Sequence, residues 1–338
     1  MPSINFLILI LTTRCDLQCA YCYNGDLPPL SMSRPILERA LALAAEGEGP
    51  LRVQLTGGEP TLVPELIEAA AQAAQKLSRP TRLSLQTNGV NLDRAMVKFL
   101  KKLDVEVGLS LDGGPAIQAA QRGQSRAVFQ ALAALEREKW PFTVTTVVTA
   151  RNCQDLAEVP LILSQYGMAR GLGLDLLVRK GRLGVAAPEP TELAVGARKL
   201  REALGFVNAR RKKPLTLREM EFLRRARLQG EGAFCLACLG LSLAVTPAGQ
   251  VYPCGQAAFR EESRLGEVFG QGLASSPLGP AASLTLAGPH CQGCFLKGAC
   301  PGECPSRLSL SQSSGQNPRL TCVLYRALAE PGPGQGLA

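Results

Sequence analysis

Short β-rich runs alternate with helix-length amphipathic segments from residue 5 to about residue 212, and no other feature of the sequence restricts the fold more strongly. The expected strands are residues 6–12, 51–56, 82–87, 105–111, 142–149 and 171–178, near-continuous apolar runs that are typical of strands covered on both faces. The expected helices are residues 34–45, 63–77, 92–102, 115–139, 155–166 and 190–211. These six units predict an α/β fold, a partial (β/α)6 barrel of the TIM type with its chemistry on the loops after the strands.

The regular pattern ends after residue 212. A helical stretch at residues 217–228 leads into a region rich in Cys and Gly, residues 235–322, where strong periodicity is lost. We therefore expect four parts: a core of residues 1–212, a helical bridge of residues 213–234, a small, irregular, Cys-rich cluster-binding domain of residues 235–325, and a disordered tail of residues 326–338.

The chain has twelve cysteines and no export signal. Its longest early apolar run, residues 6–11, lacks a preceding basic segment and is far shorter than the ~20 residues that a membrane span needs. We expect a cytoplasmic protein without a membrane partner. Because the reducing cytosol keeps thiols free, so many cysteines indicate metal binding and not a disulfide framework.

The formal net charge of +9 counts every thiol as neutral. Metal-bound thiolates would lower it, so much of the basicity compensates charge within the protein, and the rest is typical of a solvated surface. We therefore expect no nucleic-acid partner, although an acidic peptide or protein partner stays open.

Three closely spaced cysteines, Cys15, Cys19 and Cys22, follow the first expected strand in a C-x3-C-x2-C loop. A structural zinc site takes four protein ligands, whereas three thiolates on a four-iron cluster leave one iron open for chemistry. A zinc site would need a fourth ligand nearby, and the single histidine of the chain is His290. The loop therefore favours an iron–sulfur cluster.

In spacing and position this loop resembles the radical S-adenosylmethionine (SAM) superfamily, including Tyr21 as the aromatic residue before the third cysteine. The resemblance implies a [4Fe-4S] cluster that binds SAM and an enzyme that cleaves SAM reductively to a 5′-deoxyadenosyl radical, which abstracts hydrogen from a substrate. The protein would orient the reactants and exclude solvent.

Later expected strands end in segments that are similar to the SAM-binding elements of that family. Gly57, Gly58 and Glu59 belong to a GGEP element, whose glycines would let the backbone approach SAM; an ordinary Gly-Gly turn is the alternative. The resemblance adds Asn88, Ser110, Asp112 and Arg122 to the implied pocket. Ser110 and Arg122 would lie near the carboxylate and ribose of SAM, or else be a strand-end serine and a surface arginine.

The C-terminal cysteines resemble the SPASM extension of radical SAM enzymes, which implies two auxiliary [4Fe-4S] clusters. The implied ligands are Cys235, Cys238, Cys254 and Cys304 for the first cluster and Cys291, Cys294, Cys300 and Cys322 for the second. Cys235 lies only three residues before Cys238, so an open iron in the first cluster is an alternative, as are two structural zinc ions. Cys153 fits neither set and is expected to be a small buried residue.

The resemblance covers about residues 5–325 and favours a peptide maturase that acts on a peptide or protein side chain. A maturase of a small-molecule or of a metal or tetrapyrrole cofactor is the alternative, and a non-catalytic iron–sulfur electron carrier or scaffold is an alternative of another class. Expected partners are an electron donor of the flavodoxin or ferredoxin type and a separate leader-binding protein, because no leader-binding domain of about 80 residues precedes the first strand.

Sulfatase-maturing members of this family carry a general-base Asp directly after the cysteine that ends the G-x4-C element. Gly255 occupies this position here, which argues against formylglycine formation. Tyr252, Asp175 and Glu303 remain as candidates for a base.

Overall fold

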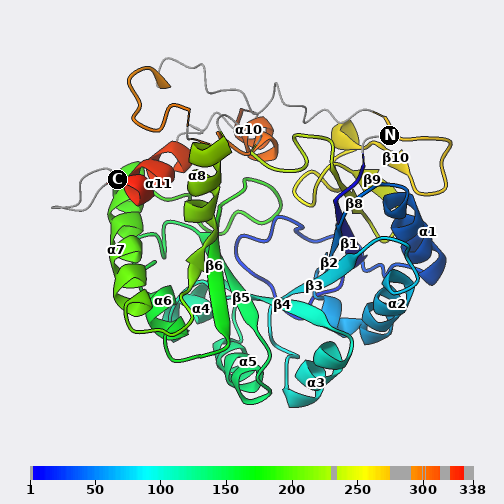
Figure 1. Cartoon of the computed structure of the whole chain (residues 1–338), viewed down its shortest axis with the longest axis horizontal. Coiled ribbons are helices and arrows are strands. Elements are labelled where there is room, and N and C mark those ends of the chain that lie inside the picture. The colour runs from blue at the N-terminus through cyan, green and yellow to red at the C-terminus, as the bar shows by residue number, and fades with distance from the viewer. Residues whose placement is uncertain are drawn as a thin grey trace.

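The computed structural model describes residues 3–229, 234–274, 291–298, 300, 302–312 and 320–330. Its strands form one sheet in the order β10-β9-β8-β1-β2-β3-β4-β5-β6-β7, parallel from β8 through β7. The strands are β1 (Phe6–Thr12), β2 (Leu51–Gly57), β3 (Thr81–Thr87), β4 (Val105–Ser110), β5 (Phe142–Val148), β6 (Ala169–Leu176), β7 (Thr216–Leu217), β8 (Ser242–Val245), β9 (Gln250–Tyr252) and β10 (Gly266–Glu267). Figure 1 shows the sheet curving around the centre of the molecule, which confirms the partial α/β barrel.

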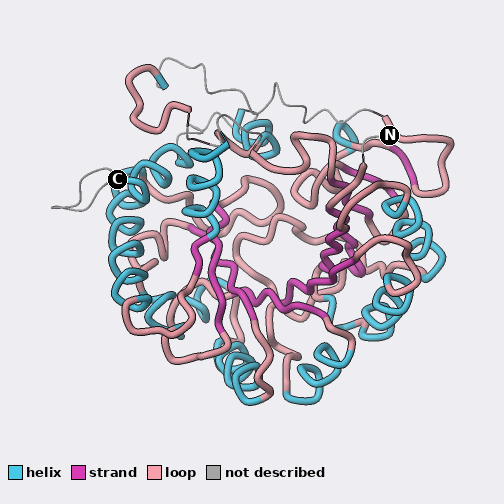
Figure 2. The backbone as a smooth tube through the Cα atoms, in the orientation of Figure 1, coloured by secondary structure: helices cyan, strands magenta, loops and turns pink. Residues whose placement is uncertain are grey.

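Helices cover the outer, convex side of this curved sheet, and Figure 2 shows them surrounding the strands. The helices of the described residues are α1 (Arg34–Ala45), η1 (Pro60–Leu62), α2 (Pro64–Ala74), α3 (Arg94–Lys102), α4 (Pro115–Gln121), α5 (Ser125–Arg137), α6 (Glu158–Leu163), α7 (Pro190–Asn208), α8 (Arg218–Gln229), η2 (Glu261–Ser263), α10 (Pro305–Gln312) and α11 (Leu320–Ala329). The single helix expected at residues 115–139 is wrong. Gly123 (φ +82°) and Gln124 (φ +45°) take left-handed backbone conformations, which an α-helix cannot continue, and they separate α4 from α5.

The two faces of the sheet differ. Along β2, Val53 and Leu55 are buried in the main core, whereas Gln54 between them is only half-buried. The partner of Gln54 on β3 is Ser84, so the inner face is polar across both strands. The expectation of strands covered on both faces is therefore wrong for β2, because helices cover only its outer face. β1 is covered on both faces as expected, because Ile8 packs against Ala244, Tyr252 and Ala258 of the C-terminal region.

The cysteine-rich region begins as part of the barrel sheet. β8 pairs in parallel with β1, and β9 and β10 follow as antiparallel strands. α11 packs against α7, where Arg201 donates to the carbonyl of Ala327 at 3.4 Å. The predicted tail of residues 326–338 overlaps the last four residues of α11, which ends at Ala329. Residues 331–338 lie outside the described part of the chain. None of the described helices is long and apolar enough to cross a membrane.

Candidate active site at the C-terminal edge of the sheet

The loop that carries Cys15, Cys19 and Cys22 directly follows β1, and we call these three thiols the loop site. Backbone hydrogen bonds hold the loop from two sides. Ala20 donates to the carbonyl of Gln121 in α4 at 2.9 Å. On the other side, its carbonyl and that of Cys22 accept from Gly184 (2.8 Å) and Arg182 (2.9 Å) in the β6–α7 loop. The loop is therefore fixed by elements far along the chain.

Side-chain contacts connect the loop site to the end of β3. The carboxylate of Asp16 accepts hydrogen bonds from Asn88 (2.7 Å) and Asn91 (2.8 Å). The Asn88 amide also lies 3.9 Å from the Cys15 sulfur. Asn88, predicted to line the SAM pocket, thus fixes the cysteine loop. The sequence singled out neither Asp16, which occupies one of the variable positions of the cysteine motif, nor Asn91, which follows the strand-end segment that ends at Gly89.

Gly57 and Gly58 bring the end of β2 against the start of the same loop. Gly58 donates to the carbonyl of Thr12 (2.7 Å), and Glu59 donates to that of Arg14 (2.8 Å). A Cβ on Gly58 would lie 2.2 Å from the carbonyl oxygen of Arg14, a distance that no side chain tolerates. The close packing of Gly58 against the Arg14 carbonyl therefore requires glycine at this position, whether or not a ligand approaches it.

Glu59 is buried and ties three segments together. Its Oε1 accepts hydrogen bonds from the Thr61 amide (3.1 Å), the Thr61 hydroxyl (2.6 Å) and the Thr87 hydroxyl (2.7 Å), and its Oε2 accepts from the Asn88 amide (2.8 Å). Burial raises the pKa of Glu59, and these hydrogen bonds oppose that rise. Its carboxylate is occupied by the protein, so Glu59 acts by positioning the ends of β2 and β3.

Tyr21, Asp112 and Arg122 form a buried network behind the loop site. The Tyr21 hydroxyl donates to Asp112 Oδ2, and Arg122 donates to both carboxylate oxygens, at 2.9 Å and 3.3 Å. The guanidinium also lies 5.2 Å above the centre of the Tyr21 ring. Ser110 is bound elsewhere and accepts from Gln86 at 3.1 Å. The arginine predicted for the SAM pocket is therefore already paired with a carboxylate, and it lowers the pKa of Cys19, which burial raises more strongly.

A cavity of about 420 Å³ opens beside the loop site. Cys15, Cys22, Gly58 and Asn24 are among the residues that line it. Asn24 Oδ1 is buried and has no hydrogen-bond partner in the structure. The volume lies within the ~300–1,000 Å³ typical of cofactor sites. Burial raises the pKa of Cys15 to about 11, so this thiol would lose its proton on binding a metal. Two of the three thiols thus open onto a cavity large enough for a cofactor, and of the residues predicted for the SAM pocket Gly58 lines it.

The C-terminal cysteines lie in two groups. In the first auxiliary site (Cys235, Cys238, Cys254 and Cys304), the sulfurs of Cys235 and Cys238 are 3.5 Å apart. Burial, together with the charges of Cys254 and Cys235, raises the pKa of Cys304 to about 12. In the second auxiliary site (Cys291, Cys294, Cys300 and Cys322), burial and the other three thiols raise the pKa of Cys322. The resemblance implied the same two groups; their role as ligands stays a prediction.

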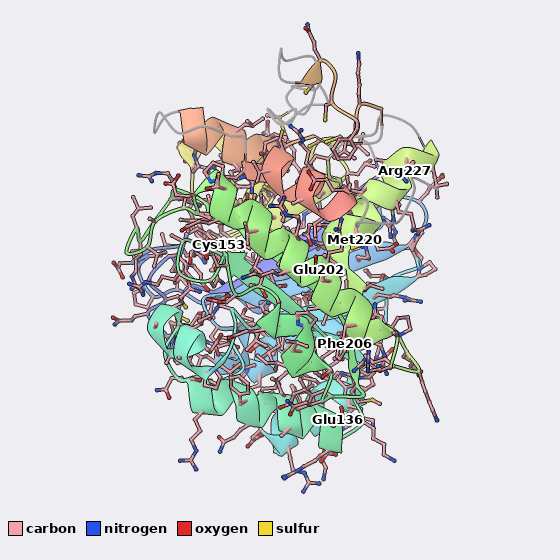
Figure 3. All side chains as sticks on the ribbon, turned by 90° about the vertical axis from the view of Figure 1, so that its left-hand side faces the viewer. Glu136, Cys153, Glu202, Phe206, Met220 and Arg227 are labelled. Carbon is pink, nitrogen blue, oxygen red and sulfur yellow. The ribbon has the colours of Figure 1, made fainter. Side chains whose placement is uncertain are left out.

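The described residues include all twelve cysteines, and none of them forms a disulfide. Among the described residues, no group of three His, Cys, Asp or Glu side chains is arranged to hold a single metal ion. Cys153 joins none of the three thiol sites. It is fully buried, its carbonyl packs closely on Gly196 of α7, and Figure 3 shows its position beside that helix. The prediction of a small buried residue is confirmed.

The three candidate bases differ in accessibility. The Tyr252 side chain is buried, with its hydroxyl 3.5 Å from Gln250. Glu303 is buried and accepts from Arg307 and from the backbone amide of Cys304. The Asp175 carboxylate, at the end of β6, is 43% exposed and accepts from Arg218 at 2.7 Å. Of these three candidates, only Asp175 is open to a substrate.

The sequence pattern of the radical SAM superfamily matches residues 9–159 of this chain. The match spans β1 to β5 and includes the loop site. The chain is 27% identical to the serine-type anaerobic sulfatase-maturating enzyme of Klebsiella aerogenes, over 94% of the chain and 82% of that protein. It is also 28% identical to an uncharacterised protein of Methanocaldococcus jannaschii, over 53% of the chain and 65% of that protein.

Two groups of solved structures share the fold. The structure of anSMEcpe with bound AdoMet superposes with a TM-score of 0.79 at 22% identity, covering 97% of this chain and 92% of that one. The structure of Streptococcus suis SuiB bound to S-adenosylmethionine gives a TM-score of 0.65 at 16% identity, covering 90% and 74%. The likeness extends through the cysteine-rich region as well as the barrel.

Proposed function

We propose that this chain is a radical SAM enzyme of the SPASM type that modifies a peptide or protein side chain. The observation that carries the proposal is the loop site, where three free thiols follow β1 beside a cavity of about 420 Å³ at the C-terminal edge of the barrel. When bound there, a [4Fe-4S] cluster supplies the electron that cleaves SAM and thereby generates the hydrogen-abstracting radical.

The residues of the chain itself would perform three tasks at this site. Cys15, Cys19 and Cys22 would ligate the cluster and leave one position for SAM. The Asp112–Arg122 pair holds Tyr21, and with it the loop, in place. Gly57, Gly58, Asn88 and Ser110 would line the SAM pocket at the ends of β2, β3 and β4. The barrel mouth and the residues above it would exclude water from the reaction.

The two auxiliary sites would each hold a further [4Fe-4S] cluster with four thiolate ligands. Cys235 lies 3.5 Å from Cys238, which supports its membership of the first set, and so a closed first cluster. In this proposal, residues 1–212 form the core, residues 213–234 the helical bridge and residues 235–325 the cluster-binding domain. The auxiliary clusters would accept the electron that a net two-electron oxidation of the substrate releases.

A peptide substrate is supported by the extent of the homology. The Klebsiella relative, a sulfatase-maturating enzyme, aligns over 94% of the chain, and SuiB is known in complex with its precursor peptide SuiA. The substrate differs from that of the sulfatase-maturing branch, because Gly255 supplies no carboxylate. Among the described residues, the nearest neighbours of a Cβ built there are Ile8 and the Tyr23 hydroxyl, each at 4.0 Å. We propose Asp175 as the base, since its carboxylate is exposed at the barrel mouth.

The proposed setting is the cytoplasm, where a flavodoxin- or ferredoxin-type protein would deliver the electron. A separate leader-binding protein would present the peptide. The second candidate, a maturase of a small-molecule or metal cofactor, would need no leader-binding partner. It predicts that hydrogen abstraction depends on a cofactor precursor and not on any peptide.

Anaerobic reconstitution tests the proposal directly. The parent chain should bind about 12 irons and form 5′-deoxyadenosine with dithionite and SAM, whereas the C15A/C19A/C22A variant should bind about eight and form none. Cys153→Ala is the matched control, because Cys153 is a buried thiol outside all three sites, and it should retain all of the iron. Two zinc ions per chain and no nucleoside would overturn the proposal.

A second experiment separates the two substrate classes. Peptides encoded beside the gene, and extracts of small molecules, are added to the loaded enzyme, and mass spectrometry records which compound loses hydrogen. Asp175→Asn should abolish product while leaving uncoupled nucleoside formation intact; the exposed Asp155→Asn serves as its control. Product formed only from a small molecule would decide for the alternative.

A further inference from the structure

We propose that two cations, Lys180 and Arg307, lie between the three thiol sites and raise the reduction potentials of the sites on either side of them. Lys180 would act between the loop site and the first auxiliary site, and Arg307 between the two auxiliary sites. This inference rests on the proposed function, because it needs clusters at all three sites.

Lys180 belongs to the β6–α7 loop and contacts the segment that follows Cys254. Its ammonium donates to the backbone carbonyls of Gln256 (3.3 Å) and Ala258 (2.6 Å). It also lies 5.7 Å above the ring of Tyr23, the residue after Cys22. The ammonium is thus held between the last cysteine of the loop site and a cysteine of the first auxiliary site. Burial lowers its pKa to about 8, and the charges of Cys254 and Cys22 both oppose that fall.

The backbone around Lys180 is fixed against the cysteine loop. Gly181 takes a left-handed conformation (φ +70°), and a Cβ there would lie 2.3 Å from the carbonyl oxygen of Cys22. The Arg182 amide donates to the same carbonyl at 2.9 Å, and its guanidinium pairs with Asp26. The backbone that carries Lys180 is therefore packed tightly against the cysteine loop.

Arg307 occupies the corresponding position between the two auxiliary sites. Its guanidinium donates to Glu303, which precedes Cys304 of the first site, and to Thr321, which precedes Cys322 of the second. The Arg307 side chain is 15% exposed, and burial lowers its pKa to about 10, while the charges of Tyr325, Asp175 and Cys322 oppose the fall. One guanidinium thus joins the two cysteine-bearing segments.

The effect on potential follows from charge. One-electron reduction adds a negative charge to a thiolate-rich site, and a nearby cation stabilises the reduced form more than the oxidised form. Both cations are partly buried, so water screens them less than it would at the surface. Each should therefore make reduction easier at its two neighbours and have little effect on the distant third site.

The test is a redox titration of the loaded protein followed by electron paramagnetic resonance. The C15A/C19A/C22A variant assigns the signals of the auxiliary sites. Lys180→Met should lower the midpoint potentials of the loop site and the first auxiliary site and leave the second unchanged. Arg307→Met should lower both auxiliary potentials and leave the loop site unchanged. Lys180→Arg and Arg307→Lys keep the charge and should restore most of each shift.

Glu303→Gln should shift the potential in the opposite direction, and it provides a test if Arg307→Met fails to fold. It removes a negative charge beside Cys304 and should raise the potential of the first auxiliary site. A parent chain without three redox-active sites would overturn the proposed function itself. Three sites whose potentials are unmoved by these variants, or shift equally at all three, would overturn only the inference about the cations.

Discussion

In the barrel, large side chains such as Leu9, Leu55 and Leu109 are fully buried in one continuous core, whereas the apolar cluster that contacts Cys235 and Cys254 consists of two alanines, Ala237 and Ala257. The alanines pack against cysteine side chains and little else that is apolar. Burial of apolar surface stabilises a fold in proportion to its area, at about 25 cal/mol per Å². The barrel can therefore fold by burial alone, while the segments around the first auxiliary site depend on what their thiols bind.

Removing the metal should have the largest effect and should act on only one of these regions. We expect residues 234–241 and 254–260 to lose most of their amide protection when the loaded protein is stripped of iron without oxygen, because bound metal contributes about 10 kcal/mol or more to folding at some structural sites. Strands β2 to β4 should keep their protection in the same hydrogen-exchange experiment. Equal loss in both regions would show that the barrel also depends on the clusters.

The barrel core is tested by two neighbouring positions on β2. Leu55→Ala removes a fully buried side chain and should cost about 2–5 kcal/mol in the free energy of unfolding. Gln54→Ala lies on the half-buried inner face and should cost less than about 1 kcal/mol. Urea unfolding of the iron-free chain measures both. Similar costs would mean that the inner face is packed like the outer one.

The strands were predictable because each is a short apolar run between helix-length segments, although the runs were taken to be covered on both faces. The inner face was misjudged because the sequence does not reveal which side a helix covers. Ser84 and Gln86, on β3, alternate with the buried Leu83 and Leu85 and belong to the polar inner face of the sheet. Similarly, the break between α4 and α5 depends on Gln124, a residue type that seldom marks a turn.

The cysteine groups were implied by the resemblance of the cysteine pattern to the SPASM extension, but no pattern indicated the residues that hold the cysteine loop. Asp16 and Asn91 meet across 75 positions, and Lys180 meets Ala258 across 78. Only the closure of the sheet brings such pairs together. Arg122 was recognised by its distance from Ser110, yet its actual partner, Asp112, was predicted as a separate pocket residue.

A smaller effect is expected where the barrel meets the loop site. Gly58→Ala places a Cβ 2.2 Å from the Arg14 carbonyl and should destabilise the chain by about 1–3 kcal/mol, because backbone must move to relieve the overlap. The loaded variant should lose about four irons, those of the loop site alone. Gly272→Ala is the control, since a Cβ there meets nothing within 4 Å. Iron loss from all three sites would contradict the expectation that this substitution affects the loop site alone.

The smallest effect is expected on the outer surface of the barrel. Phe206 lies on α7, labelled in Figure 3, and is 55% exposed, with the Arg210 guanidinium 3.6 Å from its ring centre. An exposed cation–π contact is worth about 0.5–1 kcal/mol, so Phe206→Ala should change the unfolding free energy by no more than that. The buried Phe142→Ala should cost about 3–5 kcal/mol in the same urea series. A large loss at Phe206 would mean that another surface covers this side of α7, since isolated exposed contacts cannot supply it.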